Sequence, residues 1–154
     1  MNKAFREYLN RPRMLTAKLN DAVTQFHELW AACTKQTTSF DAVGGHGGGG
    51  GDAKDGILAA YADFRNTQIR LRDARESARE DIRDLLTRVA DRGDPRSALL
   101  LELRYLDMLE WDDVHDRLVE RGHPCRALRT VLNWHGDALL RAERIWEERN
   151  GKDE

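Results

Sequence analysis

Basic and amide side chains gather in one stretch of the chain, residues 117–135. Four arginines stand there against a single acid, Glu120, although the formal net charge of the whole chain is −2. Guanidinium groups neutralise phosphates, and amide or hydroxyl side chains add hydrogen bonds to a nucleic-acid backbone or to base edges. Six side chains are therefore candidate contacts to double-stranded DNA: Arg117, Arg121, Arg126, Arg129, Thr130 and Asn133.

Part of this stretch could also distinguish one base pair from another. Helical periodicity places the candidates from Arg126 to Asn133 opposite the side of their helix that carries Leu128 and Val131. Asparagine suits adenine and arginine suits guanine in the major groove. The alternative interpretation is an ordinary solvated helix face without a ligand, and the residues alone do not separate the two.

Metal ligands and catalytic groups are the other chemistry that the residue types allow. His115, His123, Cys125 and His135 fall within one region, but their spacing matches no closed zinc site, which needs four ligands in paired short spacings. We expect His135 to be a packed helix residue and His123 a turn residue. The sequence indicates no nucleophile paired with a base, and no pair of carboxylates that would converge on one substrate. The sequence therefore predicts no metal, no cofactor and no enzymatic activity.

The composition predicts that helices carry these side chains. The chain has 154 residues, of which 34% are charged, 40% hydrophobic and only 7% aromatic. This balance favours long solvated helices over an all-β core. No run approaches the roughly 18 apolar residues of a membrane span, and no apolar targeting segment opens the chain. Cys33 and Cys125 form no close pair. We therefore expect an all-α, cytoplasmic protein without membrane contact.

Two long amphipathic helices are predicted in the N-terminal part, over residues 12–33 and 56–91, because apolar residues recur there every three or four positions. A short separate helix is expected over 3–9, since Pro12 disfavours a helical conformation at the residue before it. Its buried side would consist of Phe5, Tyr8 and Leu9.

The glycine-rich stretch 34–55 is predicted to be a flexible loop between the two long helices. It lacks the Gly-Lys-Ser/Thr ending and the preceding strand of a phosphate-binding P-loop. The two helices are expected to lie antiparallel as a hairpin. Because each apolar stripe is narrow, we also expect a homodimer formed through these helices.

Three further helices are predicted over 95–107, 111–121 and 124–149, with a tight turn over 121–124. Gly93 would stop the preceding helix, and Asp94 and Pro95 would cap and begin the next one. Two short helices at a tight turn, the later one exposing basic side chains, form the helix-turn-helix pattern. The predicted domains are a helical hairpin over 1–92 and a helix-turn-helix domain over 93–150. The predicted core of this domain consists of Leu99, Leu103, Leu106, Val114, Leu118, Leu128, Val131, Ala138 and Leu139.

Three runs in this part carry a family resemblance: Leu-Glu-Leu-Arg-Tyr at 101–105, Trp-Asp-Asp-Val at 111–114, and Thr-Val-Leu-Asn-Trp-His-Gly-Asp-Ala-Leu at 130–139. They resemble the C-terminal part of short phage and prophage proteins that are similar to region four of sigma-70 factors. The N-terminal part, from Tyr8 to Leu29, is similar as well, so the resemblance covers most of the chain. It implies that the helix after Pro124 is a recognition helix. It also implies a regulator of phage or prophage transcription that binds double-stranded DNA beside RNA polymerase.

Two alternative functions fit the same helices. The first is a helical interaction or structural protein that does not bind DNA. The second is a small terminase subunit for DNA packaging, since those phage proteins also join a helix-turn-helix to a helical oligomerisation region. Packaging and portal genes beside the coding sequence would favour the terminase.

Overall fold

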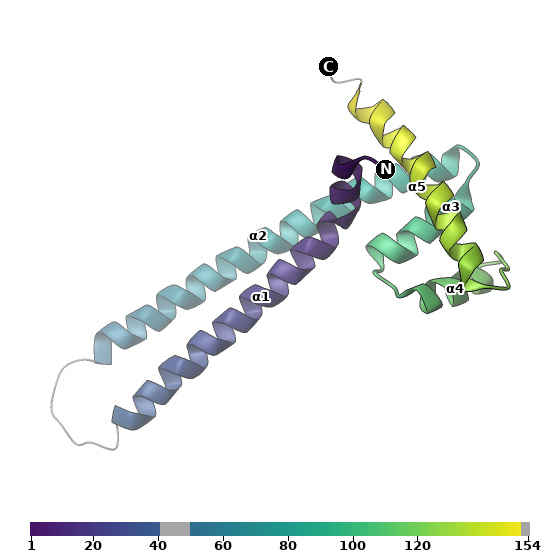
Figure 1. Ribbon diagram of the computed structural model, residues 1–154. Helices are drawn as coiled ribbons and strands as arrows, with labels where there is room; N and C mark the ends of the chain where they lie inside the picture. The colour runs from purple at the N-terminus through teal and green to yellow at the C-terminus, as the bar shows by residue number, and fades with distance from the viewer. Residues whose placement is uncertain (41–49, 152–154) are drawn as a thin grey trace. The chain divides into compact units, whose positions relative to one another are not determined.

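Every regular element that the structure describes is helical. The computed structural model describes the backbone of residues 1–40 and 50–151, and the side chains of residues 1–35 and 55–151. These ranges contain no strand, which confirms the all-α prediction. None of their helices is long and apolar enough to cross a membrane. The helices are α1 (Lys3–Phe40), α2 (Gly50–Asp91), α3 (Pro95–Leu101), the π-helix η1 (Glu102–Leu106), α4 (Trp111–Glu120) and α5 (Leu128–Asn150) (Figure 1).

The chain divides into two compact units. Unit 1 joins Met1–Met14 to the chain from Arg75 onward, and unit 2 is Leu15–Ala74. The domain boundary that we predicted between residues 92 and 93 does not coincide with this division. The reason is that the second half of α2 buries Ile82, Leu85 and Val89 in the same core as the C-terminal helices.

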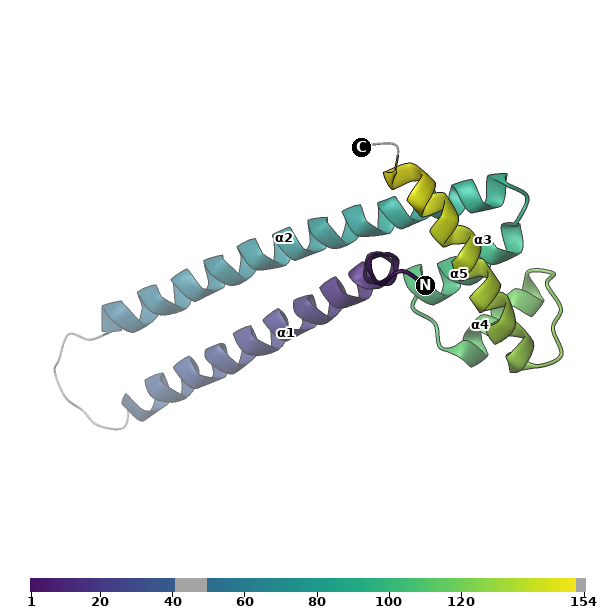
Figure 2. The same ribbon diagram turned by 45° about the horizontal axis from the view of Figure 1, so that its top comes forward.

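Unit 1 is built around one continuous apolar core. Within it, α5 lies across α3 and α4 in both views (Figure 1 and Figure 2). Leu99 and Leu139 are only half-buried. Leu128 is exposed, because α5 begins at this residue and not at Pro124 as predicted, which leaves Leu128 at the helix end. The other predicted core residues are buried: Leu103, Leu106, Val114, Leu118, Val131 and Ala138.

α1 runs through Pro12 as one helix, so the predicted separate helix over 3–9 and the predicted helix start at residue 12 are wrong. Proline lacks the N–H that would bond to the carbonyl of Tyr8. Tertiary contacts outweigh this loss. Phe5 is fully buried, and the Tyr8 hydroxyl donates to the backbone carbonyl of Asp81 at 2.7 Å. Both contacts hold the first turns of α1 within unit 1.

Unit 2 consists of the segments of α1 and α2 between Leu15 and Ala74, which run antiparallel side by side (Figure 1 and Figure 2). Phe26 of α1 stacks on Phe64 of α2 with ring centroids 4.4 Å apart. The ring of Tyr61 lies 5.8 Å from that of Phe26. Aromatic packing therefore joins the two segments.

Both helices extend further toward the glycine-rich stretch than predicted. α1 continues past residue 33 to Phe40, and α2 begins at Gly50 and not at residue 56. The Thr34 hydroxyl donates to the carbonyl four residues earlier at 3.0 Å, so this polar side chain bonds within the helix instead of ending it. The middle of the predicted flexible loop 34–55, residues 41–49, lies outside the described residues.

The start of α3 agrees with the sequence prediction. Gly93 has a φ of +89°, a conformation that glycine adopts without steric cost. The Ser97 N–H donates to the Asp94 carboxylate at 3.1 Å, and Pro95 occupies the first helical position. Arg141 of α5 also pairs with Asp94, which ties α5 to this cap.

The prediction of one α-helix over 95–107 is wrong, because α3 ends as an α-helix at Leu101. The hydrogen bonding widens into the π-helix η1, and Asp107 N–H donates to the Glu102 carbonyl at 3.0 Å. Arg79 of α2 donates to the Leu106 carbonyl at 2.7 Å, which provides a partner for a carbonyl at the helix end. Met108 then adopts a φ of +57°, in the left-handed region.

Candidate nucleic-acid interface

α4 and α5 are consecutive helices joined by residues 121–127. Gly122, at φ +86°, ends α4, and the Gly122 and His123 N–H groups donate to the carbonyls of Val119 and Leu118 at 3.1 and 2.9 Å. The connection is longer than the predicted turn over 121–124, and α5 begins at Leu128 instead of Pro124.

A histidine of α4 contacts this connection. The Nε2 atom of His115 on α4 lies 3.0 Å from the backbone carbonyl oxygen of Cys125. His115 therefore fastens the connection to α4 in an extended form.

The protonation of His115 affects this contact. Its Nδ1 atom lies 3.1 Å from the Asp116 carboxylate. The hydrogen bond with Asp116, followed by that with the Cys125 carbonyl, raises the pKa of His115 above its ordinary value. The imidazolium form donates from both ring nitrogens, so it holds both partners at once.

Five of the six predicted DNA contacts are exposed side chains: Arg117, Arg121, Arg126, Arg129 and Asn133. Thr130 is half-buried. Its side chain is therefore less accessible than the other five.

The predicted arginines differ in their partners. Arg117 pairs with Glu120, with Nη1 and Oε2 3.1 Å apart, so part of its charge is neutralised within α4. In the part of the chain that the structure describes, Arg121, Arg126 and Arg129 form no ion pair. These three arginines therefore carry the unneutralised positive charge of the region.

α5 brings together only part of the predicted set. Arg129 and Asn133 are four residues apart and share one face of the helix. Arg121 and Arg126 lie in the connection before it. Asp137, one turn beyond Asn133, is also exposed and ends the cationic part of this face. The cationic part of this region is thus the connection and the first two turns of α5.

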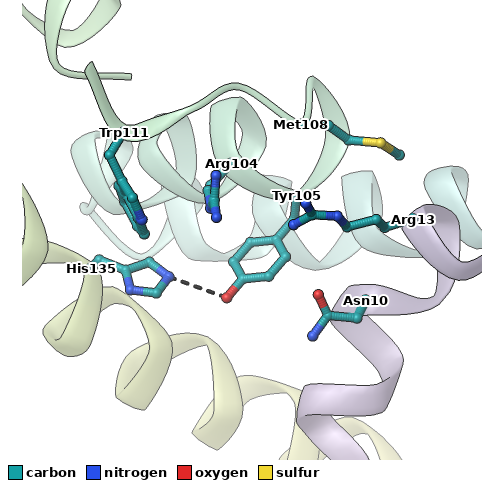
Figure 3. Close-up of a pocket in the computed structure, with 7 residues that line it drawn as sticks. All are labelled: Asn10, Arg13, Arg104, Tyr105, Met108, Trp111 and His135. Carbon is teal, nitrogen blue, oxygen red and sulfur yellow. Dashed lines mark hydrogen bonds between the residues drawn. The ribbon is translucent and has the colours of Figure 1, made fainter. Parts of the chain in front are cut away.

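The structure also assembles side chains that sequence reasoning did not bring together. The hydroxyl of Tyr105 in η1 lies 3.2 Å from Nε2 of His135 in α5 (Figure 3). The Trp111 ring meets the His135 ring edge-on, with centroids 4.8 Å apart. His135 is half-buried in this cluster, which confirms that it is a packed helix residue. These residues belong to the runs that carry the family resemblance, but no local spacing predicts that they meet.

Burial changes the acidity of both members of this hydrogen bond. It raises the pKa of Tyr105, and it lowers the pKa of His135, with the nearby Arg104 guanidinium lowering the latter further. Both groups are therefore neutral near pH 7.

Potential metal ligands do not converge. Among residues 1–35 and 55–151 no three histidine, cysteine or acidic side chains are placed to hold a metal ion. His115 is bonded to Asp116 and to the Cys125 carbonyl, and His135 to Tyr105.

Comparison with known proteins finds no family model, no curated protein and no solved structure that matches this chain. The resemblance to sigma region four stays a prediction.

Proposed function

We propose that this protein binds double-stranded DNA through residues 121–133 and regulates transcription as a sigma region-four-like helix-turn-helix protein. The observation that carries the proposal is a group of three exposed arginines, Arg121, Arg126 and Arg129, next to the exposed Asn133 on α5; within residues 1–35 and 55–151 these arginines form no ion pair. Unpaired surface arginines bind phosphates without first having to break a contact within the protein.

The secondary structure around these residues supports the same function. α4 and α5 each bury a residue in the same core, Leu118 and Val131 respectively. The first turn of α5 has no side-chain cap. The Thr130 N–H donates to the Ala127 carbonyl at 3.0 Å, so the N–H groups of Leu128 and Arg129 are the ones that a phosphate oxygen would meet. With α5 in the major groove, Asn133 would reach a base edge while the arginines hold the backbone.

The biological setting follows from the resemblance alone. Proteins of this kind would act in phage or prophage transcription, beside RNA polymerase. The rival functions, an interaction protein without DNA binding and a small terminase subunit, share the helical architecture and differ in what residues 121–133 contact.

Duplex selection and salt titration test the proposal. From a random-sequence pool, wild type should enrich a defined site, and binding should weaken steeply with salt because neutralised phosphates release counterions. Arg129→Ala should lower affinity and flatten the salt dependence. Asn133→Ala should relax discrimination at one base pair by on the order of 1–3 kcal/mol and leave non-specific binding nearly unchanged.

Arg144→Ala is the matched control. Arg144 is an exposed arginine of the same helix, about 22 Å along the axis from Arg129 at 1.5 Å per residue. Arg144→Ala removes the same charge as Arg129→Ala. Equal losses of DNA affinity for the two variants would therefore mean that only the net charge of the protein matters. If wild type enriches no sequence and binds bulk DNA no better than Arg129→Ala, the interaction-protein function replaces this one.

The predicted homodimer through the long helices is part of the proposal. In unit 2, large apolar side chains on both helices are about half exposed, among them Leu29 at 46%, Trp30 at 49% and Tyr61 at 47%. A second copy would cover this set with the same set of its own. Light scattering that gives a monomer mass at high micromolar concentration would contradict it.

A further inference from the structure

A second feature of unit 1 is a pocket on the opposite side of α5 from the proposed DNA face. It has a volume of about 190 Å³. Asn10 and Arg13 of α1, Arg104 and Tyr105 of η1, Trp111 of α4 and His135 of α5 line it (Figure 3). His135 lies two residues beyond Asn133, which is a rotation of about 200° around the helix. DNA held at Asn133 therefore does not reach this pocket.

The charge around the pocket is positive. Arg13 is exposed and, in the described part of the chain, has no ion-pair partner. The Arg104 side chain is only 18% exposed, lies with its guanidinium carbon 4.6 Å from the Trp111 ring centroid, and donates to the Leu109 carbonyl at 2.7 Å. Among the described residues, the acid that forms an ion pair with it is Glu110 at 3.8 Å, which is 74% exposed. Solvent screens that pair strongly.

The same sign of charge acts on the neutral groups of the pocket. The charges that perturb Tyr105 are Arg104 and Arg6, and the charge that perturbs His135 is Arg104. No carboxylate is among them. An anion that enters the pocket would thus meet two guanidinium groups at its wall.

The neutral residues add hydrogen-bond donors. Tyr105 and neutral His135 hold two hydrogens between them and use one in their mutual bond. Whichever tautomer is present, one hydrogen of the pair is left to donate, either from the tyrosine hydroxyl or from the histidine Nδ1. The Asn10 amide donates one hydrogen to the Arg6 carbonyl at 2.9 Å and keeps a second.

The backbone that shapes the pocket is unusual. Tyr105 lies in the π-helix η1, and Met108, which also lines the pocket, has a φ of +57°. π-helical turns and left-handed non-glycine residues cost free energy and recur at functional sites.

We infer that this pocket binds a small oxyanion, the phosphate or carboxylate group of a low-molecular-weight ligand. Its volume is below the 300 Å³ or more that is usual for drug-sized ligands, which fits a small anion. This binding goes beyond DNA recognition and does not depend on it.

The experiment is an NMR titration of the full chain with sodium phosphate and, separately, sodium acetate at constant ionic strength. Phosphate should shift the ring signals of His135 and the indole N–H of Trp111 with saturating, millimolar affinity. The stronger of the two salts identifies the anion class. Arg13→Gln should weaken binding about tenfold, the value of one hydrogen bond to a charged group. Tyr105→Phe should weaken it less, because it removes only the hydroxyl.

Arg11→Gln is the matched control, since Arg11 is exposed on the same helix and does not line the pocket. It should bind like wild type. The inference is overturned if neither salt produces saturating shifts at His135 and Trp111, or if Arg13→Gln and Arg11→Gln behave alike. It is also overturned if Arg13→Gln weakens duplex binding as much as Arg129→Ala does, because the pocket would then be a DNA phosphate contact.

Discussion

Asp94 makes two contacts in unit 1 whose contributions to stability can be measured separately by substitution. Its carboxylate accepts the Ser97 N–H at the start of α3 and pairs with Arg141 of α5. Asp94→Ala removes both contacts, whereas Asp94→Asn keeps an oxygen for Ser97 and loses the charge. Arg141→Gln removes the ion pair from the other side.

The magnitude follows from these contacts. A helix cap contributes about 1 kcal/mol, and an ion pair with a half-exposed arginine about 0.5 kcal/mol. Asp94→Ala should therefore lower the free energy of unfolding by about 1.5 kcal/mol, and Asp94→Asn and Arg141→Gln by about 0.5 kcal/mol each. The Asp94→Asn/Arg141→Gln double variant should lose no more than either single one, because both remove the same pair.

The effect should also depend on pH. Burial alone would raise the pKa of Asp94, but the hydrogen bonds from Ser97 and the contacts with Arg141 outweigh it and hold the pKa below its ordinary value of 3.8. A carboxylate with a lowered pKa stabilises the fold above its unfolded-state pKa, and this contribution is lost as the pH falls through the folded-state value. The difference between wild type and Asp94→Ala should be full at pH 7 and shrink below about pH 4.

Urea unfolding followed by tryptophan fluorescence measures these differences. Three of the four tryptophans, Trp111, Trp134 and Trp146, belong to unit 1, so the signal reports the unit that contains the cap. If Asp94→Ala and Asp94→Asn destabilise equally, the cap hydrogen bond contributes nothing measurable. If the loss for Asp94→Ala does not change between pH 7 and pH 3, the ionised carboxylate is not what stabilises α3.

Two further results are expected in unit 1. By NMR, His115 should titrate with a pKa above its ordinary value of 6.5, and Asp116→Asn should lower this raised pKa. The contribution of His115 to the free energy of unfolding is full below pH 6.5 and is lost as the pH rises through the raised pKa. In urea unfolding, Leu118→Ala should lower the free energy of unfolding by about 2–5 kcal/mol, because Leu118 is fully buried. Val119→Ala, at a neighbouring side chain that is 42% exposed, should lower it by no more than about 0.5 kcal/mol.

Local patterns predicted the elements of the fold well where the physics is local. The three-to-four spacing of apolar residues indicated the long helices, and Gly93, Asp94 and Pro95 marked the start of α3 correctly. The prediction of a helix break at Pro12 was wrong because it considered only the local loss of one backbone hydrogen bond. The contacts that outweigh this loss join residues far apart in sequence: Phe5 packs in the core, and Tyr8 bonds to Asp81.

The candidate site shows the same limit. The exposure of Arg129 and Asn133 agrees with helical periodicity, whereas Arg126 is exposed in the connection before α5, outside the helix in which it was predicted. The bond between His115 and the Cys125 carbonyl, which joins the connection to α4, depends on tertiary geometry and has no signature in spacing. The meeting of Tyr105 with His135, thirty residues apart, likewise depends on how η1 and α5 pack.

The uneven burial of α5 has a consequence for how this helix moves. Among its first ten residues only Val131 is buried, whereas Ala138, Ala142, Glu143 and Ile145 are buried further on. Segments with few buried contacts open with the smallest free energy, so amide hydrogens near Arg129 should exchange with solvent sooner than those near Ala142. If DNA occupies the early turns, binding would suppress their opening, and part of the gross interaction energy would be spent on ordering them. The intrinsic affinity for DNA would then depend on the local stability of those turns as well as on their charge.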